Sequence, residues 1–255
     1  MAQRLTFRDK ATDVAWQKQL RDKYLDEGAP SANLDLSAAV VRPISYHQAK
    51  QIIFKYEWLG TMASTSHHYG LFFGMYCAGV CCVSAPLNGA GVYVAKEWGL
   101  TPDKMAYLAR GANVHWSPHG ANSKLVAWTC KLVYKQTNTK LIIAYSDTDA
   151  GEIGTIYQAC NWVCVGRGDS TRQWIAPNGR VYDQKYPYDL MVRQGNIKPR
   201  SHYVNMLYKA GWHEQDSNPK YRYVYVLDKS DKRLIDLVES KRTPYPKRQI
   251  EPASD

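Results

Sequence analysis

The stretch LIIAYSDTDAGEIGTIYQACNWVCVG, residues 141–166, decides the fold of this chain. Its first five residues form a short apolar run that predicts a strand, and this strand stops at Ser146 and Asp147. A small polar turn follows, then a helical segment around residues 152–159 and a second strand over 162–166. In α/β proteins, ligands bind where strands end at the carboxyl edge of the sheet. We therefore predict that Asp147 lies at a functional site.

The residues on the N-terminal side of this stretch predict more strands and helices. Ser45 and Gln48 have the spacing of a capping box, so we expect a helix over 49–59. A glycine-rich loop over 88–91 and a helix over 125–136 are also expected. The expected strands cover residues 38–44, 68–76, 80–84 and 105–110, with a tight turn at Ala78-Gly79. The order predicts an α/β (α+β) fold, in which an antiparallel N-terminal meander leads into βαβ units of a mixed central sheet with helices on both faces.

The remaining segments set the expected domain organisation. An Asn178-Gly179 turn predicts a hairpin over 174–182, and an aromatic strand is expected over 221–227. We predict that residues 1–36 form an N-terminal helical extension with a surface helix over 12–27. Residues 37–255 are then a single catalytic domain with an aromatic and basic C-terminal extension from about residue 197.

Charge and composition favour a polyanion as the partner. The 255-residue chain has a formal net charge of +10, and it contains 19 tyrosines and eight tryptophans. Basic residues bind phosphates, and flat rings stack on an extruded base. No run of about 18 apolar residues predicts a membrane span, and the N-terminus lacks the apolar core of a signal peptide. Six cysteines without a C-x-x-C pair indicate free thiols in a reducing cytosol and no metal site, although Cys160, Cys164 and a distant histidine are an alternative.

The loop over 117–124 is the first candidate site. A strand ends before it, and a helix begins at Ser123 and Lys124, where unpaired backbone N–H groups bind anions. We therefore expect a cofactor to bind at Gly120, Asn122, Ser123 and Lys124, together with Arg110 at the end of the preceding strand. The alternative is an ordinary capped helix and a surface salt bridge.

Asp147 and Tyr157 are the candidates for proton transfer. Because neighbouring parallel strands end side by side, Asp147 should lie at the same sheet edge as Arg110. Tyr157 follows ten residues later on a helix, where its hydroxyl can point to the same crevice. A carboxylate and a phenol there can act as base and acid for attack by an amine and departure of a thiolate. The alternative is a helix N-cap and a half-buried core tyrosine.

Several motifs of this chain resemble the Mom family of bacteriophage DNA-modification proteins. They are YEWLGTMAS (56–64), YLARGANV (107–114), GANSK (120–124), the stretch from Asp147 to Trp162, and YRYVYVL (221–227) with YPKR (245–248). The similarity covers about residues 40–250. Family members are similar in fold to GNAT-type acyltransferases. They convert adenine in phage DNA to an N6-carbamoylmethyl derivative, which protects that DNA from host restriction enzymes.

The resemblance implies a set of roles for this chain. The active-site residues would be Arg110, Ser123, Asp147 and Tyr157, the partners double-stranded DNA and a small-molecule group donor, and the location the host cytoplasm. Acetyl-CoA or another acyl-CoA-like compound would be that donor. The chain departs from the family pattern at Glu57-Trp58, where a His-Tyr pair is expected, and at Glu152, where a histidine is expected.

Modification of adenine N6 requires the base to leave the stack, so aromatic platforms are expected. Tyr56, Trp58 and Trp116 are the candidates for binding the substrate, while Trp162 fits the core best. A carbamoylmethyl group is attached to N6 through its CH2 carbon, whereas plain acyl transfer leaves an amide. The resemblance therefore does not determine which compound donates the group. Two alternatives remain. One is a GNAT-like acyl-CoA-dependent N-acyltransferase that acts on a small amine or a hypermodified base, and the other is a non-catalytic DNA-coating protein.

Overall fold

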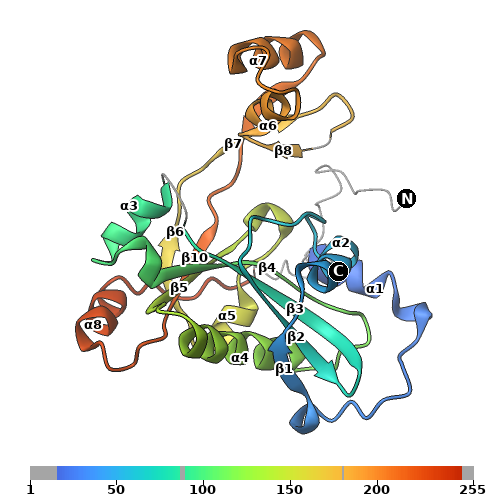
Figure 1. The fold of residues 1–255 in the computed structure, drawn as a ribbon, viewed down its shortest axis with the longest axis vertical. Coiled ribbons are helices and arrows are strands. Elements are labelled where there is room, and N and C mark those ends of the chain that lie inside the picture. The colour runs from blue at the N-terminus through green and yellow to red at the C-terminus, as the bar shows by residue number, and fades with distance from the viewer. Residues whose placement is uncertain (1–15, 87–89, 180, 249–255) are drawn as a thin grey trace, which may run out of the picture.

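A computed structural model describes residues 16–86, 90–179 and 181–248 (Figure 1). Within them, one large sheet has seven strands in the order β1-β2-β3-β4-β5-β10-β6. These strands are β1 (Val40–Pro43), β2 (His67–Phe73), β3 (Tyr76–Ser84), β4 (Met105–Asn113), β5 (Leu141–Ser146), β10 (Tyr221–Val226) and β6 (Val163–Arg167). β4 and β5 are parallel, and the other neighbours are antiparallel. The predicted mixed α/β sheet is confirmed.

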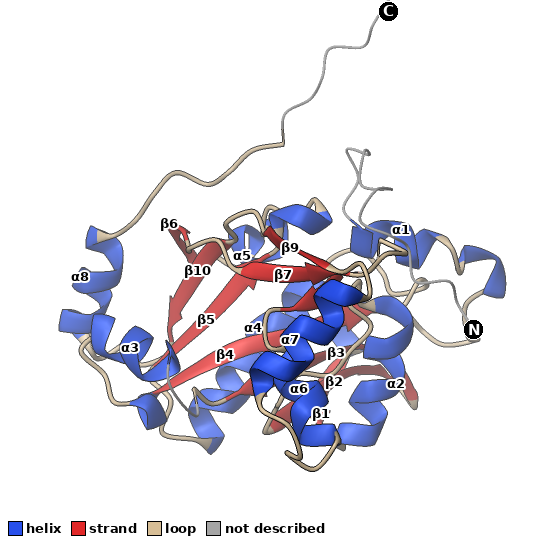
Figure 2. Ribbon diagram, turned by 90° about the horizontal axis from the view of Figure 1, so that it is seen from above, coloured by secondary structure: helices blue, strands red, loops and turns tan. Residues whose placement is uncertain are grey.

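The helices cover both faces of this sheet. They are α1 (Trp16–Asp22), α2 (Tyr46–Tyr56), α3 (Ala90–Glu97), α4 (Ala121–Gln136), α5 (Thr155–Ala159) and α8 (Lys232–Ser240). Consecutive residues of a strand point to opposite faces. In β3, Cys81 lies against Thr129 of α4, whereas Cys82 lies near Glu57 at the end of α2. Figure 2 shows α3 and α8 at one end of the sheet and α1 and α2 at the other.

The apolar run of β5 is explained by burial on both faces. Leu141 and Ile143 belong to the core cluster under α3 and α8, whereas Ile142 and Ala144 belong to the cluster under α4. All four side chains are fully buried. A strand of this kind needs no polar alternation, and for this reason its position is evident in the sequence.

β4 and β5 pair over only part of their length. Their parallel register runs from Met105 opposite Leu141 to Leu108 opposite Ala144 and then stops. Directly after this point, the register of β4 against β3 shifts between Leu108 and Arg110, which is a β-bulge that includes Ala109. The two strands therefore separate toward their carboxyl ends.

Two sequence-based expectations are corrected between residues 74 and 97. The turn of the first hairpin lies at Gly74-Met75, and Ala78-Gly79 lies inside β3. Gly79 is small because the side chain of Asn113 lies against it, and a Cβ there would approach Asn113 Oδ1 to 2.5 Å. Ala90 and Gly91, which were expected in a loop over 88–91, instead begin α3, while residues 87–89 lie outside the described part of the chain.

The N-terminal cap of α2 is as predicted. Ser45 Oγ accepts a hydrogen bond from the Gln48 backbone N–H, and Gln48 Oε1 accepts one from the Ser45 N–H, so both halves of the capping box form. The helix expected over 12–27 is the shorter α1 followed by a 3-10 turn, η2 (Leu25–Glu27), and residues 12–15 lie outside the described ones.

β10 enters the sheet between β5 and β6, and so β6 has no pairing with β5. The chain between β6 and β10 forms an inserted lobe, residues 168–220. It contains a three-stranded sheet in the order β8 (Val181–Asp183), β7 (Arg172–Ile175) and β9 (His213–Asp216). In the chain, α6 (Tyr186–Arg193) and α7 (Arg200–Lys209) lie between β8 and β9. The expected hairpin is confirmed by the pairing of Trp174 with Tyr182. Figure 1 shows the lobe standing off from the large sheet. The predicted division into domains stays a prediction.

Side chains from the helices and loops around the large sheet hold the N-terminal arm, which we define as residues 16–38. Lys124 Nζ donates to the carbonyl of Leu36, and His115 Nε2 lies 2.7 Å from the carbonyl oxygen of Gly28. Lys55 pairs with Glu27 at 2.6 Å. These contacts bring the arm against the loop between β4 and α4.

Gly154 is required where the segment before α5 touches β10. Its φ is +74°, and a Cβ at this position would overlap the ring of Tyr223. The Tyr223 hydroxyl donates to the carbonyl of Ile153, and Gln158 Nε2 donates to that hydroxyl at 3.0 Å. The glycine therefore allows both the backbone turn and the ring contact that places α5.

Gly154→Ala is expected to lower the free energy of unfolding by about 2–4 kcal/mol, because backbone strain and overlap with a buried ring add. Gly74→Ala is the matched control, since its φ is +58° and a Cβ there meets nothing within 4 Å. The control should cost only the strain, about 1–2 kcal/mol. Urea denaturation of both variants measures the difference, and equal losses would contradict the proposed ring contact.

Candidate functional site

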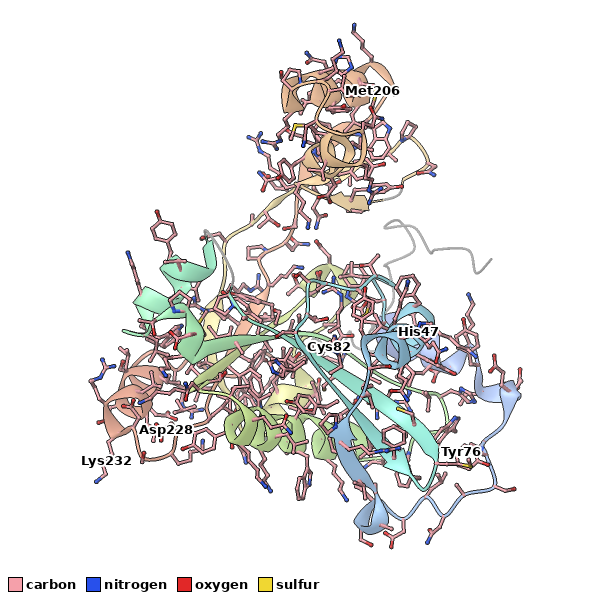
Figure 3. The ribbon with its side chains drawn as sticks, viewed as in Figure 1. His47, Tyr76, Cys82, Met206, Asp228 and Lys232 are labelled. Atoms are coloured by element: carbon pink, nitrogen blue, oxygen red, sulfur yellow. The ribbon has the colours of Figure 1, made fainter. Side chains whose placement is uncertain are left out.

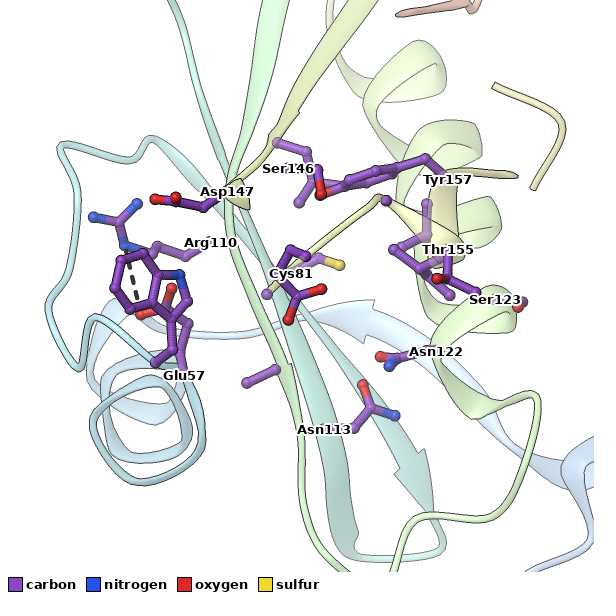
Figure 4. Close-up of a pocket in the computed structure, with 18 of the residues that line it drawn as sticks. Glu57, Cys81, Arg110, Asn113, Asn122, Ser123, Ser146, Asp147, Thr155 and Tyr157 are labelled. Carbon is purple, nitrogen blue, oxygen red and sulfur yellow. Dashed lines mark ion pairs between the residues drawn. The ribbon is translucent and has the colours of Figure 1, made fainter. Parts of the chain in front are cut away.

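A cleft of about 1210 Å³ opens where β4 and β5 separate. Residues from β4, the end of β5, the start of α4, α5 and the end of α2 line it. Figure 4 shows two halves on either side of the end of β5. The first half holds Glu57, Arg110 and Asp147, and we call it the α2 half. The second holds Asn122, Ser123 and Tyr157, and we call it the α4 half.

Arg110 is held firmly in the α2 half. It lies opposite Cys82 and therefore points to the face of the sheet that α2 covers. Its Nε donates to the carbonyl of Thr61 at 2.8 Å, and its Nη1 donates to the carbonyl of Ala109 at 2.7 Å. Glu57 Oε2 lies 4.0 Å from Nε. Among the described residues no partner occupies Nη2, so one guanidinium nitrogen is left for a ligand.

Glu57 lies where the resemblance led us to expect a histidine. The residue is only 7% exposed, and its Oε2 accepts hydrogen bonds from the backbone N–H groups of Leu59 and Gly60. The carboxylate therefore ends α2, shapes the loop that follows and neutralises part of the charge of Arg110. These contacts give Glu57 a structural role that does not need an imidazole.

Asp147 ends β5 as predicted, and it has two partners. Its Oδ1 accepts from the backbone N–H of Asp149 at 3.0 Å, which caps the 3-10 turn η5 (Thr148–Ala150). Its Oδ2 pairs with Lys220 Nζ at 2.8 Å. The side chain is only 8% exposed. The capping role named as the alternative is therefore present, and the carboxylate still lines the cleft.

Tyr157 lines the α4 half, and in Figure 4 its hydroxyl points toward Ser146. Burial raises the pKa of this phenol well above its ordinary value, and the nearby Cys81 and Glu152 act in the same direction. The phenol is therefore protonated over the whole neutral range. Its ring packs against Trp162 and Tyr223, with centroids 5.1 Å and 5.3 Å away.

α4 begins with a left-handed glycine and without a side-chain cap. Gly120 has φ +83°, and no side chain accepts from the first turn. Gly120, Asn122 and Ser123 all line the cleft. The Ala121 N–H donates to the carbonyl of Pro118, so the N–H groups of Asn122 and Ser123 are the ones available to an anion. Lys124 points elsewhere: its ammonium lies on the carbonyls of Leu36 and Ser37. Its part in binding a cofactor stays a prediction.

Two buried polar atoms face the cleft without a partner in the described structure. Asn113 Oδ1 is one; its Nδ2 donates to Ser117 Oγ at 3.0 Å. Ser146 Oγ is the other. Both residues line the cleft and both are at most 3% exposed. Because buried polar groups normally have partners, a bound molecule with polar atoms fits here. The only signal in the sequence was that each follows the end of a predicted strand, Ser146 directly and Asn113 three residues on.

Sequence reasoning also missed the cations that approach the cleft from distant segments. Lys18 and Arg21 come from α1, Lys220 from the end of the inserted lobe and Arg248 from the last described residue. Arg21 Nη2 donates to the carbonyls of His115 and Ser117, each at 3.3 Å. No local pattern links these four residues, since only the tertiary fold brings them together.

The predicted aromatic platforms separate into two groups. Trp58 lines the cleft. Tyr56 is buried and its hydroxyl lies 2.7 Å from His115 Nδ1, while Trp116 packs against Phe73; neither lines the cleft. Trp162 is 1% exposed and belongs to the core, as expected. A substrate-binding role for Tyr56 and Trp116 stays a prediction.

The described residues contain no group of three or more His, Cys, Asp or Glu side chains that could hold a metal ion. All six cysteines are free thiols. In this part of the chain no helix has the length and apolar character needed to cross a bilayer.

Solved structures similar to this chain include several acyltransferases. A ribosomal-protein-S5-alanine acetyltransferase from Vibrio fischeri has 9% identity and a TM-score of 0.43, covering 78% of this chain and 98% of its own. NAA60 from Arabidopsis thaliana, solved with acetyl-CoA, has 10% identity and a TM-score of 0.42, covering 74% and 98%. FeeM, an N-acyl amino acid synthase from uncultured soil microbes, has 14% identity and a TM-score of 0.41, covering 75% and 93%.

No curated protein matches the sequence. The model of the Mom protein family, by contrast, matches residues 38–247. This range contains both strand ends, the start of α4, α5, the inserted lobe and β10. Family membership makes the protein a transferase of the kind that modifies adenine in phage DNA. Because the match spans most of the 255 residues, the chain belongs to the Mom protein family.

Proposed function

We propose that this protein transfers a group from a small-molecule donor to N6 of adenine in double-stranded DNA, giving an N6-carbamoylmethyl or related derivative. The observation that carries the proposal is the cleft at the separated ends of β4 and β5, with Asp147 in one half and Tyr157 in the other. A cleft with two halves suits a reaction that brings two substrates together.

The donor is assigned to the α4 half. The start of α4 offers backbone N–H groups near Gly120, Asn122 and Ser123, which favour the phosphates of a CoA-like compound. Asn113 Oδ1 and Ser146 Oγ add an acceptor and a hydroxyl for polar atoms along the donor. An acyl-CoA-like donor is consistent with these groups. Acetyl transfer from acetyl-CoA breaks the thioester and leaves an amide on N6, so a carbamoylmethyl product needs a donor whose CH2 carbon bonds to N6 as the leaving group departs from that carbon.

The adenine is assigned to the α2 half, beside Trp58 and Asp147. Because the base must leave the double helix to reach a cleft, the ring of Trp58 supplies a surface on which it can stack. Arg110 Nη2 then faces the transferred group, where a guanidinium binds a carbonyl or carboxylate oxygen. Net charge of +10 favours the polyanionic substrate.

Asp147 and Tyr157 are assigned opposite roles in proton transfer. As N6 forms a bond to the donor carbon, the nitrogen becomes acidic and gives its proton to the Asp147 carboxylate. Lys220 Nζ pairs with Asp147 Oδ2 at 2.8 Å and holds the carboxylate at the cleft. Tyr157 keeps its proton through the neutral range and gives it to the leaving group.

Asp147→Asn is expected to lower adenine modification by about 10²–10⁴-fold, because the amide accepts no proton but keeps the cap on Asp149. Lys220→Gln removes the ion pair and leaves the carboxylate, so it should retain activity within about tenfold. Mass spectrometry of nucleosides from plasmid DNA of expressing cells measures both variants beside the wild type, and the mass of the adduct identifies the transferred group.

Equal losses in the two variants would mean that Asp147 acts through its ion pair with Lys220. Full activity of Asp147→Asn would overturn its assignment as the base. A new adduct on a free amine, with unmodified DNA, would favour the small-amine acyltransferase.

Tyr157→Phe should lower modification by a similar factor while keeping the ring contacts with Trp162 and Tyr223. Because burial raises the pKa of this phenol, Tyr157 stays protonated at the pH at which an ordinary tyrosine ionises, and it loses its proton only at higher pH. The tyrosinate absorbance of wild type minus variant should therefore not rise between about pH 9 and 11, where an ordinary tyrosine ionises. A rise there would show that Tyr157 is accessible to water and would contradict its role as a protected acid.

A further inference from the structure

We propose that the tip of the inserted lobe, residues 192–200, is a second contact with double-stranded DNA that lies outside the cleft. The tip comprises the last residues of α6, the connection and the first residue of α7, and every one of its residues is exposed. The proposal rests on the proposed function, because it takes double-stranded DNA as the substrate that the cleft modifies.

The helical part of the lobe is strongly basic. Residues 185–209 contain five Lys or Arg side chains and one acidic side chain, Asp189. Arg193, Lys198 and Arg200 belong to the tip itself. No acidic side chain that the structure describes forms an ion pair with these three. Three cations at one exposed turn form a positive surface that suits the phosphates of a nucleic acid.

Internal ion pairs hold some cations of the protein, whereas the three cations of the tip have none among the described residues. Arg222 forms two hydrogen bonds with Glu97, Lys140 pairs with Asp231 at 2.9 Å, and Arg172 at the base of the lobe pairs with Glu214 at 3.1 Å. The charges of the tip therefore do not serve the internal stability of the lobe, and they suit an external anion.

Arg200 lies where it opposes the stability of its own helix. It is the first residue of α7, and the first turn of this helix contains no acidic residue. A cation at a helix N-terminus is repelled by the helix dipole. An external anion that binds Arg200 would offset this repulsion. The position of Arg200 at the start of α7 therefore favours the binding of a phosphate.

Ile197 is an apolar side chain among these cations, and it is 78% exposed. Val192 at the end of α6 is also exposed. Proteins that enter a DNA groove commonly place an apolar side chain against sugar and base edges while flanking cations bind the phosphates. A second copy of this chain is a poor partner, because two tips with the same sign of charge repel each other.

The lobe is attached at the sheet end that carries Asp147. Asn218 Nδ2 donates to Asp149 Oδ1 at 2.7 Å, and Thr148 Oγ1 donates to the carbonyl of Pro219. The lobe also has its own core, with Trp174, Tyr203 and Leu207 buried. A lobe with its own core, attached beside Asp147, can hold the duplex in a fixed relation to the cleft (Figure 1).

The triple variant Arg193→Gln, Lys198→Gln, Arg200→Gln tests the charge contact. Its control is Lys135→Gln, Lys232→Gln, Arg233→Gln, which removes the same number of exposed charges from α4 and α8. Figure 3 shows Lys232 far from Met206 of the lobe. Fluorescence anisotropy with a mixed-sequence DNA duplex, over a range of salt concentrations, measures both.

The tip variant should bind DNA about 10–100-fold more weakly near 0.1 M salt, and the slope of log K against log salt should become less steep by about 2–3. In the control variant, both the affinity for DNA and the salt slope should stay close to those of the wild type. An unchanged slope in the tip variant, or an equal loss in the control, would overturn the proposal.

Ile197→Ser tests the apolar contact, with Met75→Ser as the matched control, since Met75 is 79% exposed at the tip of the β2–β3 hairpin. Ile197→Ser should weaken DNA binding by about 3–10-fold at every salt concentration and leave the slope unchanged, because it removes apolar contact and no charge. Equal affinity of Ile197→Ser and wild type would overturn the groove contact.

Nucleoside mass spectrometry on the same variants separates this proposal from the reaction. Weaker binding by the tip variant, together with a wild type that forms no adduct, would refute the reaction and leave the DNA contact supported. Normal binding by the tip variant, with modification intact, would refute the contact and leave the reaction supported.

Discussion

The separation of β4 and β5 is the constraint on which the rest of the structure depends. Two parallel strands in the middle of a sheet normally stay paired, but here the bulge at Ala109 ends the pairing after Leu108. The backbone beyond that point needs other partners, and side chains near the gap, such as Asn113 and Ser146, keep unpaired polar atoms. α4 packs against β3 and β4 beside this gap, and residues of α4 and α5 line the cleft that it opens.

The sequence was most informative where local chemistry alone determines structure. β5 is evident because its apolar run is buried on both faces, and the cap of α2 is evident because Ser45 and Gln48 suffice to form it. The hairpin turn was misplaced because Gly79 is small for a tertiary reason, its contact with Asn113. The insertion of β10 between β5 and β6 has no local signal, since any of several sheet positions suits an aromatic strand.

The same distinction between local and tertiary causes applies to the residues of the candidate site. Arg110, Ser123 and Asp147 were singled out because each lies at a predicted strand end or helix start, and Tyr157 because it lies on the helix that follows Asp147. All four line the cleft, and their roles stay predictions. Lys124 was expected there too, but its ammonium reaches carbonyls of a segment 88 residues earlier. Tyr56 was expected to face substrate, whereas a hydrogen bond with His115 holds it in the core. Partners of long flexible side chains are decided by tertiary contacts that spacing does not encode.

The chain order of the large sheet bears on how the protein is made. β5 and β6 end before residue 168, but the strand that joins them begins at Tyr221, after the whole lobe. During synthesis the ribosome therefore releases the lobe before the sheet beneath it is complete, and the exposed edges of β5 and β6 remain open in the meantime. Arg248 lines the same cleft as Lys18 of α1, so the lining is assembled only after β10 and α8 have been made. Until then, the open edges of β5 and β6 can pair with another chain.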